Sequence, residues 1–289
     1  MKINKFKING EKKIKLKNFA TDYTGNIETK EQGKKLLKKN RKKMRELQDM
    51  FYAFDKYSLL IIFQAMDAAG KDSSIEHVMM GVNPQGTQVF SFKQPSNEEL
   101  DHGYLWRCMK ALPERGRIGV FNRSYYEDVL VARVHNLIEN QKIPKEFITP
   151  IIWEQRFEQI KNFEKYLYNN GTRIIKFFLN VSKAEQKNRF MKRLETPSKN
   201  WKFSASDLKE RELWDEYQIA YQDAINETST KYAPWYIIPA DNKWYARLAI
   251  SEIINNVLES LDIEYPKLDK EQIAKLNRYK TQLENEEDV

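Results

Sequence analysis

Residues 64–74, QAMDAAGKDSS, have the composition of a loop that could bind phosphate. Phosphate-binding loops of the pattern G-x-x-x-x-G-K-[ST] place glycines and a lysine between a strand and a helix. Gly70 and Lys71 fit, whereas Ala65 replaces the first glycine and Asp72 replaces the final hydroxyl residue. Alanine is the next smallest residue, so the segment still predicts a phosphate loop. The alternative is a tight strand-to-helix turn that binds nothing.

Backbone N–H groups would supply most phosphate contacts in such a loop, because they converge with a helix N-terminus on one anion. We expect these contacts from Ala68, Ala69 and Gly70, with the ammonium group of Lys71 reaching over the phosphate. The hydroxyl of Ser73 comes one position later than in the usual pattern and is a further candidate.

Two carboxylates make this loop unusual, since Asp67 and Asp72 should repel a phosphate chain. They become compatible with phosphate if a divalent cation lies between carboxylate and phosphate, because Mg²⁺ favours hard oxygen ligands. Asp67 is the better metal ligand, since it lies inside the loop. For Asp72, capping of the following helix is an equally reasonable role.

A second candidate segment, VFNRSYYEDVLVARVH at 120–135, follows a short apolar run. Asn122 stands where phosphate-loop proteins often place an acidic magnesium ligand, and an amide is the weaker ligand. Arg123 and Arg133 carry planar guanidinium groups that bind phosphate oxygens in pairs. The alternative is a surface helix with salt bridges. Further candidates for substrate contact in or just before this segment are Arg117, Tyr126, Glu127 and Asp128.

A third segment, 183–211, holds nine Lys/Arg residues. Arg189 and Arg193 lie four positions apart and therefore on one face of a helix. Lys199 and Lys202 follow in a loop. A mobile basic lid of this kind could close over phosphates, stabilise their charge and exclude water. The alternative is a helix that exposes its polar face. A phosphate loop, a metal site, arginines and a basic lid are the parts that an enzyme of phosphoryl transfer needs, so the three segments together predict that reaction.

Short apolar runs alternate with helical patterns along the chain, which predicts a parallel sheet covered by helices on both faces. We expect strands at 57–63, 87–92, 117–121, 172–180 and 235–240. Ser182 and Glu185 form a capping-box signature for a helix that continues to about 195. The other helices are expected at 28–54, 72–80, 97–112, 124–138, 146–170, 244–261 and 267–285.

The composition excludes several classes of protein. The 289 residues are enough for one large core, and no apolar run is long enough to span a bilayer. The N-terminus lacks an apolar stretch typical of secretory signals. Cys108 is the only cysteine, which excludes an internal disulfide and fits a reducing, cytoplasmic location. The three histidines match no zinc spacing.

Positive charge is concentrated at the N-terminus. Residues 1–50 hold 16 Lys/Arg and 6 Asp/Glu, a net charge of +10, so the rest of the chain sums to −2. A basic arm either attracts a polyanion or is simply a solvated extension. We therefore divide the chain into a basic extension and helix at 1–54, a core at 55–265 with a lid at about 183–211, and a C-terminal helix with an acidic tail at 266–289.

Three motifs resemble the polyphosphate kinase type 2 family. They are MDAAGKD, GRIGVFNRSYYEDVLVARVH and RF-x2-R-x3-P-x-K-x-WKFS-x2-D, which occur in the family's order and spacing across about residues 50–250. The resemblance implies a P-loop kinase-like, three-layer α/β/α fold with a parallel five-stranded sheet and a helical lid. It also implies transfer of phosphate between inorganic polyphosphate and nucleotides. The expected cofactor is Mg²⁺, and Mn²⁺ is the alternative ion.

Carried onto this chain, the resemblance implies that Lys71 and its loop bind the transferring phosphates and that Asp67 organises metal. Many family members have Asp at the position of Asn122, which leaves residue 122 a weak metal ligand here. Arg123, Arg189 and Arg193 complete the catalytic set. The motif NRSYYED is similar to that of the family branch called class III, whose members accept both nucleoside mono- and diphosphates.

The expected partners are polyphosphate and the nucleotides AMP, ADP and ATP, with guanine nucleotides as alternative substrates. No membrane and no specific nucleic acid are expected as partners. We expect a homodimer or homotetramer. Two other functions remain as alternatives: an ATP-dependent nucleoside monophosphate kinase, and a polyanion- or nucleic-acid-binding module that uses the basic arm.

Overall fold

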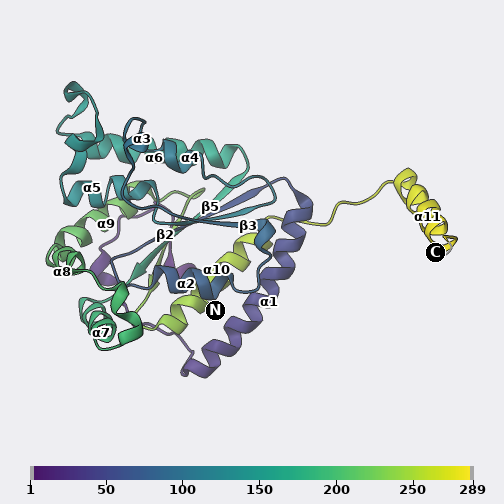
Figure 1. Ribbon diagram of the computed structural model, residues 1–289, viewed down its shortest axis with the longest axis horizontal. Coiled ribbons are helices and arrows are strands. Elements are labelled where there is room, and N and C mark those ends of the chain that lie inside the picture. Colours follow the sequence, from purple (N-terminus) through teal and green to yellow (C-terminus); the bar gives the residue numbers. More distant parts are fainter. Residues whose placement is uncertain (1–2, 287–289) are drawn as a thin grey trace.

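Parallel strands form the centre of the protein (Figure 1), whose computed structural model describes residues 3–286. The sheet has the order β1-β6-β5-β2-β4-β3, and among its described strands only the β1–β6 pair is antiparallel. The strands are β1 Lys7–Ile8, β2 Ser58–Gln64, β3 Thr87–Ser91, β4 Ile118–Asn122, β5 Thr172–Asn180 and β6 Trp235–Pro239. The expected five-stranded parallel sheet is confirmed, with one short antiparallel edge strand added.

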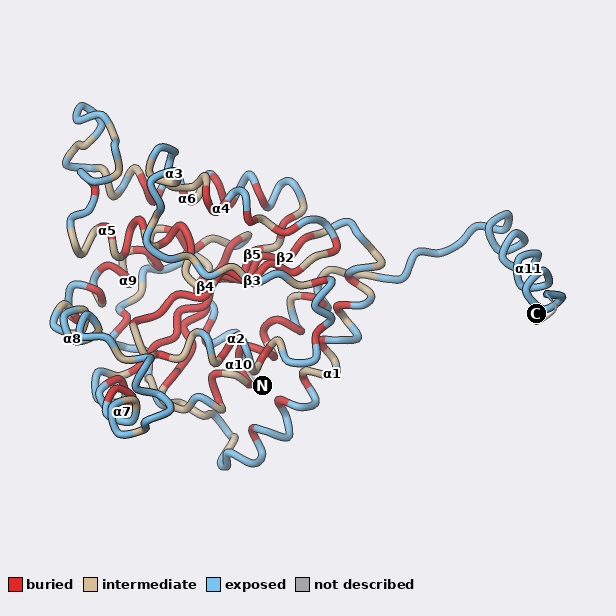
Figure 2. Tube along the Cα trace, viewed as in Figure 1, coloured by how far each residue is buried: buried red, intermediate tan, exposed pale blue. Residues whose placement is uncertain are grey.

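Strand β2 occupies the middle of the sheet, between β5 and β4. All seven of its residues are buried because helices cover both faces, which explains its continuous apolar sequence (Figure 2). The carboxyl ends of the parallel strands meet at one edge. The loops that follow β2 and β4 lie side by side there, and these loops carry the first two chemical motifs.

The helices form two layers around the sheet (Figure 1). Helices α1, α2 and α10 pack together on one face, and α6 packs against α9 and β5 on the other. Their bounds are α1 Lys30–Phe54, α2 Lys71–Met79, α3 Asn97–Leu100, α4 Trp106–Met109, α5 Val131–Val134, α6 Ile152–Asn169, α7 Lys183–Leu194, α8 Ala205–Glu212, α9 Trp214–Thr228, α10 Lys243–Glu259 and α11 Lys270–Glu284. Among residues 3–286, no helix is both long and apolar enough to cross a membrane.

Two expected helices are interrupted. The segment 97–112 forms the short helices α3 and α4, separated by a turn that contains Gly103. The segment 124–138 forms a 3-10 turn at Tyr125–Asp128, the single-turn α5 and a further 3-10 turn. Asn136 has a left-handed φ of 50°, which ends the helix there. Helices α8 and α9 were not anticipated.

The N-terminal segment before α1 is packed against the core and does not form a free tail. Phe6 and Leu16 are 3% exposed, and β1 pairs with β6. The backbone of Ile14 exchanges hydrogen bonds with the side chain of Asn226 on α9, at 2.7 and 3.0 Å. The reading of this segment as a solvated extension is therefore wrong for residues 3–29.

Helix α11 lies apart from the body of the protein at the end of an extended connector (Figure 1). None of its residues is buried. The expected C-terminal helix is confirmed, and the structure describes the tail after it only as far as residue 286.

Candidate active site

The loop between β2 and α2 has the backbone of a phosphate-binding turn. Gly70, the N-cap of α2, is left-handed with a φ of 106°, and Ala68 has a φ of 59°. A left-handed alanine is uncommon, and strained backbone of this kind concentrates at functional sites. Ala69 is buried, so its side chain faces the core and not the phosphate position.

Lys71 is the first residue of α2 and folds back over its own loop. Its Nζ donates to the carbonyl of Ala65 at 2.6 Å and lies 3.5 Å from that of Met66. Burial lowers the pKa of Lys71, and the Asp67 carboxylate opposes that shift. Phosphate oxygens would offer stronger, charge-assisted hydrogen bonds than these carbonyls. We therefore expect Lys71 to exchange its loop carbonyls for phosphate when substrate binds.

Arg123 joins the two loops at the carboxyl edge of the sheet. The backbone N–H of Arg123 donates to the carbonyl of Phe63 on β2 at 3.0 Å, and the φ angle of Arg123 is 65°. Its guanidinium lies 3.5 Å from Asp67 and 3.6 Å from Glu127. Burial opposes the charge of Arg123, but Glu127 and Asp67 outweigh it and its pKa is raised. The guanidinium therefore stays charged between two carboxylates.

Asn122 and Asp72 bind each other across the loops. Asn122 Nδ2 donates to Asp72 Oδ1 at 2.6 Å, while Asn122 Oδ1 is buried without a hydrogen-bond partner. Gly70 is the N-cap of α2 and the helix has no side-chain cap, so the capping role for Asp72 is wrong. The free amide oxygen, together with the carboxylates of Asp67 and Asp72, makes a set of hard oxygen donors.

These donors do not form a complete metal site by themselves. Within residues 3–286, no three acidic, His or Cys side chains are arranged to hold a metal ion. Mg²⁺ usually keeps several waters and takes only one or two carboxylates plus substrate phosphates. The residues present fit that kind of partly substrate-held ion.

A basic cavity of about 720 Å³ opens over the phosphate loop. Nine cationic and two anionic side chains line it, so the cavity suits a polyanion. The cationic residues are Lys71, Lys93, Arg123, Arg189, Lys192, Arg193, Lys199, Lys202 and Lys243. Of these, sequence reasoning missed Lys93, Lys192 and Lys243. Lys243 begins α10 shortly after β6, so its position near a strand's carboxyl end was a usable signal.

Arg189 holds the phosphate loop in place. It is 5% exposed, and its Nη1 donates to the carbonyls of Ala68 and Ala69 at 3.1 and 2.6 Å. Nη2 donates to the carbonyls of Ala240 and Asp241, and Nε to Glu185 at 2.8 Å. An arginine has five N–H donors, and all five are used here. The expectation that Arg189 binds phosphate directly is therefore replaced by a positioning role.

Arg193, one turn further along α7, keeps the expected orientation. Its Nη1 lies 3.3 Å from Asp207 on α8 and 3.2 Å from the Lys202 carbonyl, and its guanidinium lines the basic cavity. Lys199 and Lys202 lie in the 3-10 turn between α7 and α8 and line the same cavity. Arg193, Lys199 and Lys202 of the lid segment therefore line the basic cavity, and their contact with phosphate stays a prediction.

A smaller acidic cavity of about 390 Å³ adjoins the basic one. Asp67 and Arg123 line both cavities and so mark their junction. Beyond this junction the wall contains Glu127, Asp207, Glu210, Tyr217 and Tyr221. The two cavities differ in charge, which suits a phosphate chain on one side and a less charged group on the other.

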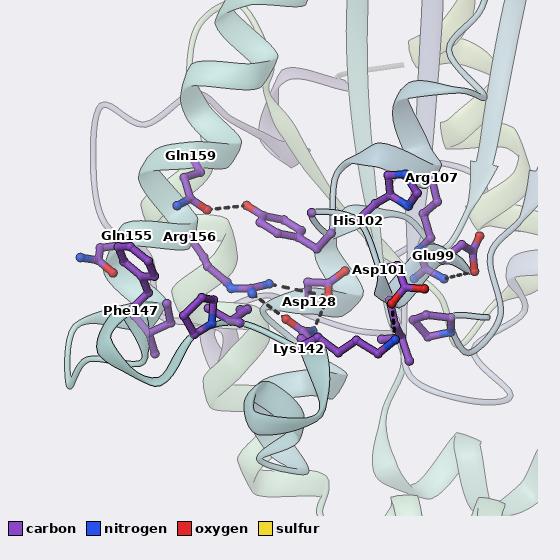
Figure 3. Close-up of a pocket in the computed structure, with 18 of the residues that line it drawn as sticks. Glu99, Asp101, His102, Arg107, Asp128, Lys142, Phe147, Gln155, Arg156 and Gln159 are labelled. Atoms are coloured by element: carbon purple, nitrogen blue, oxygen red, sulfur yellow. Dashed lines mark hydrogen bonds and ion pairs between the residues drawn. The ribbon is translucent and has the colours of Figure 1, made fainter. Parts of the chain in front are cut away.

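Four expected contact residues lie elsewhere. Arg117 precedes β4, at the amino end of the strand, and stacks 4.1 Å over the Tyr52 ring. Arg133 pairs with Asp223 at 2.9 Å. Asp128 is 5% exposed and lines a separate cavity of about 830 Å³ (Figure 3), which shares no lining residue with the other two. Tyr126 is completely buried. The expected substrate contacts of Arg117 and Tyr126 and the expected phosphate contact of Arg133 are therefore not supported, since none of the three lines the basic or the acidic cavity.

Tyr126 instead belongs to a buried polar network beneath the motif. Its Oη contacts Glu164 at 2.8 Å, Thr228 at 2.9 Å and Lys176 at 2.9 Å. Lys176 and Glu164 are fully buried and pair at 2.6 Å, and Tyr125 Oη donates to Glu164 at 2.9 Å. Because every member has partners, the network can fix the turn that presents Arg123 and Glu127.

Comparisons with known proteins agree with this geometry. The family model described as polyphosphate kinase 2 matches residues 27–266. An ADP-polyphosphate phosphotransferase of Rhodopseudomonas palustris is 48% identical over 268 residues, which cover 92% of this chain and 93% of that protein. An AMP/ADP-polyphosphate phosphotransferase of Meiothermus ruber is 43% identical over 265 residues, covering 91% and 96%.

A solved structure has the same fold. The crystal structure of polyphosphate kinase 2 from Arthrobacter aurescens matches with a TM-score of 0.87 and 39% sequence identity, over 96% of this chain and 95% of that chain. The protein belongs to the polyphosphate kinase 2 family.

Proposed function

We propose that this protein transfers phosphate between inorganic polyphosphate and nucleoside mono- and diphosphates, converting AMP to ADP and ADP to ATP. The observation that carries the proposal is the meeting of a basic and an acidic cavity at Asp67 and Arg123, beside a phosphate loop. The donor phosphate chain lies in the basic cavity, and the acceptor approaches from the other side of this junction.

Direct in-line transfer explains why no nucleophilic side chain is needed. An oxygen of the acceptor phosphate attacks the terminal phosphorus of polyphosphate, and the bond between that phosphorus and the chain breaks. Lys71 and Arg123 stabilise the charge on the transferring group, and Arg193 with the lid lysines holds the remaining chain. Arg189 keeps the loop in the conformation that these contacts require.

Mg²⁺ is the proposed cofactor, and Mn²⁺ would have the same ligand preference. Asp67 would hold the ion most directly, with Asn122 Oδ1 as a weaker ligand and phosphate oxygens and water completing the shell. When bound, the ion neutralises phosphate charge and allows the loop carboxylates to lie next to a polyanion.

The decisive experiment varies donor and acceptor independently. The protein is incubated with Mg²⁺, with either polyphosphate or ATP as the donor and with AMP, ADP, GMP or GDP as the acceptor, and the products are separated. We expect ADP and then ATP from AMP with polyphosphate alone. Transfer to AMP from ATP but not from polyphosphate would identify an ATP-dependent nucleoside monophosphate kinase instead.

The choice of acceptor is assigned to Glu127. If the reacting phosphates stay fixed over Lys71, a monophosphate must sit one phosphate deeper than a diphosphate, closer to the turn at Tyr125–Asp128. Glu127 lines the acidic cavity and pairs with Arg123, so it can position the shifted acceptor. We expect Glu127→Ala to depress the AMP reaction more than the ADP reaction. The control is Glu154→Ala, at an exposed position of α6.

Two results would correct this assignment. If the wild-type protein makes ATP from ADP but no ADP from AMP, it accepts diphosphates only. Equal losses on both acceptors in Glu127→Ala would remove Glu127 from acceptor selection. We also propose a homodimer or homotetramer, which light scattering coupled to gel filtration tests directly.

A further inference from the structure

A smaller cavity, of about 370 Å³, lies at the amino ends of the parallel strands, and we call it the amino-edge cavity. Tyr57, which precedes β2, and Arg173, the second residue of β5, are among its lining residues. None of its lining residues belongs to the basic or the acidic cavity. The phosphate loop begins at the other end of β2, about 25 Å from Tyr57 at roughly 3.3 Å per strand residue. The amino-edge cavity is therefore separate from the phosphate site.

The register of the strands brings three polar side chains of this cavity onto one face of the sheet. Lys7 of β1 pairs with Tyr236 of β6, and directly paired residues point to the same face. Tyr236 also pairs with Phe177 of β5, and Arg173 lies four residues earlier on that strand. Because side chains alternate along a strand with a period of two, Arg173 is on the face of Phe177. Lys7, Arg173 and Tyr236 therefore project from the same side of the sheet.

Aromatic rings hold the guanidinium of Arg173 in place without a carboxylate. Its Cζ lies 4.6 Å from the ring centre of Tyr57 and 4.5 Å from that of Tyr168. Within residues 3–286, the side chain of Arg173 forms no ion pair and no hydrogen bond. The two rings restrict its rotamer, so that binding an oxyanion costs less conformational entropy. A planar guanidinium fixed in this way can bind two oxygens of one phosphate group.

Tyr236 supplies a buried donor to the same cavity. It is 4% exposed and is one of the lining residues. Burial raises the pKa of Tyr236 to about 12, so the hydroxyl keeps its proton at neutral pH. No residue in the described part of the chain forms a hydrogen bond with this hydroxyl. A buried hydroxyl without a partner costs free energy, which favours an acceptor bound in the cavity.

Positive charge dominates the wall of the amino-edge cavity. Lys7, Arg173 and Lys231 line it together with a single carboxylate, that of Asp262. Lys231 lies 3.6 Å from Glu11, but the two side chains are 79% and 60% exposed, so this ion pair is weak. Three cations and a hydroxyl donor suit an anion that carries several charges along its length.

We propose that the amino-edge cavity is a second binding site for inorganic polyphosphate, remote from the phosphate loop. Phosphate oxygens accept hydrogen bonds from Arg173, Tyr236 and Lys7, and Lys231 adds charge at the rim. A nucleotide fits less well, because the Arg173 guanidinium already covers a face of each flanking tyrosine and leaves little ring surface for a base. Binding here involves no chemical step, so the site is independent of the phosphoryl transfer proposed above.

Lysine labelling locates the site without turnover. The full-length protein is treated with N-hydroxysuccinimide acetate in the presence of tripolyphosphate, AMP or neither, and acetylation at each lysine is quantified by mass spectrometry. We expect tripolyphosphate to slow the acetylation of Lys7 and Lys231 severalfold but not that of Lys12 and Lys17, which are exposed outside the cavity. AMP should protect none of the four. Protection of Lys7 and Lys231 by neither compound, or by AMP at least as strongly as by tripolyphosphate, would overturn the proposal.

Calorimetry then compares the number of tripolyphosphate molecules bound per chain. Arg173→Gln and the double variant Lys7→Gln with Lys231→Gln should each bind one molecule fewer than the wild type. The double variant changes only exposed side chains, so it keeps the comparison valid if Arg173→Gln fails to fold. The matched control, Lys12→Gln with Lys17→Gln, should bind as many as the wild type. An unchanged number in the Lys7 and Lys231 variant would refute the assignment, whether or not the protein transfers phosphate.

Discussion

Lys71 and Asp67 carry opposite charges at the position where the proposed phosphoryl transfer takes place. Removing a preorganised charge-stabilising group typically costs about 10²–10³ in rate. We expect Lys71→Ala and Asp67→Asn each to lower kcat on that scale while the unfolding temperature stays close to that of the wild type. The control is Lys165→Ala, which removes an exposed lysine remote from the cavities. Turnover near the wild-type value in either loop variant would contradict these roles.

Lys243 should make polyphosphate binding depend on pH. Burial, with the nearby charge of Arg189, lowers its pKa from 10.5 to about 8. In the folded protein the ammonium charge is therefore lost as the pH rises through about 8, and with it the attraction for phosphate. Below about pH 8 the folded protein has to hold this buried ammonium charge, which lowers its stability. Above about pH 8 the charge is lost and this unfavourable contribution to stability disappears.

The measurement is the KM for polyphosphate between about pH 6.5 and 9.5, a range that brackets the lowered lysine pKa. We expect KM to rise above about pH 8 in the wild type. In Lys243→Arg the rise should be absent, because the guanidinium does not titrate in this range. The same rise in both proteins would show that another group is responsible.

At the scale of elements, helix α7 combines two arginines with different tasks. Arg189→Ala would leave four backbone carbonyls and Glu185 without their donors, so we expect a loss of stability on the order of 3 kcal/mol together with a loss of activity. Arg193→Ala should keep the stability and lower kcat more than it raises KM. Urea unfolding and steady-state kinetics on both variants separate the two effects.

The variant Arg189→Lys provides an intermediate case, because lysine has three N–H donors where arginine has five. Arg189→Lys should fall between wild type and Arg189→Ala in stability. If Arg189→Ala unfolds like the wild type yet loses turnover, Arg189 contacts the phosphates after all. If Arg193→Ala changes only KM, the lid merely collects substrate.

At the scale of the whole molecule, the N-terminal part of α1 packs against the start of α10, where Lys243 lines the basic cavity. A Cβ on Gly33 would lie 2.3 Å from the ring of Trp244, the neighbour of Lys243 in the basic cavity. The exposed Lys34 and Lys38 are on the same turns of α1. A long polyphosphate chain that leaves the cavity would therefore pass a positive surface.

Charge removal tests this idea better than deletion, because residues 3–29 contribute to the core. The double variant Lys34→Gln with Lys38→Gln should raise the KM for long polyphosphate several-fold at low salt and weaken its salt dependence. The KM for a short chain such as tripolyphosphate should not change. As a control, Lys275→Gln with Lys280→Gln removes two charges from α11. An unchanged KM for long chains at low salt would leave the basic excess without a role in binding.

Helix α11 should be dispensable for the fold of a single chain. None of its residues is buried, although Ile273, Leu276 and Leu283 expose large apolar side chains. We expect a chain that ends at residue 266 to keep its kcat and to unfold within a few degrees of the full-length protein. Calorimetry and the donor–acceptor assay check this. A large drop in unfolding temperature, accompanied by a smaller mass in light scattering, would show that α11 stabilises an assembly.

The sequence by itself determined the parallel sheet and the phosphate loop. Strand β2 is buried on both faces and therefore contains a continuous apolar run. A loop that holds an anion needs Gly70 and Lys71 in adjacent positions. These are local requirements, so they are visible in a short stretch of chain. The resemblance to the family rested on the same motifs, because they occur in the family's order and spacing.

Only the tertiary structure decided which charged residues reach the site. Arg189 and Arg193 look equivalent in sequence, but one turn of helix directs the first onto backbone carbonyls and the second toward the cavity. Tyr126 and Glu127 are neighbours, yet the turn buries the tyrosine beside Lys176 and directs the glutamate into the acidic cavity. Lys176 and Glu164 could not be paired in advance, because their contact depends on how α6 packs against β5. Side-chain direction and long-range packing are set by the whole core, which a local pattern does not contain.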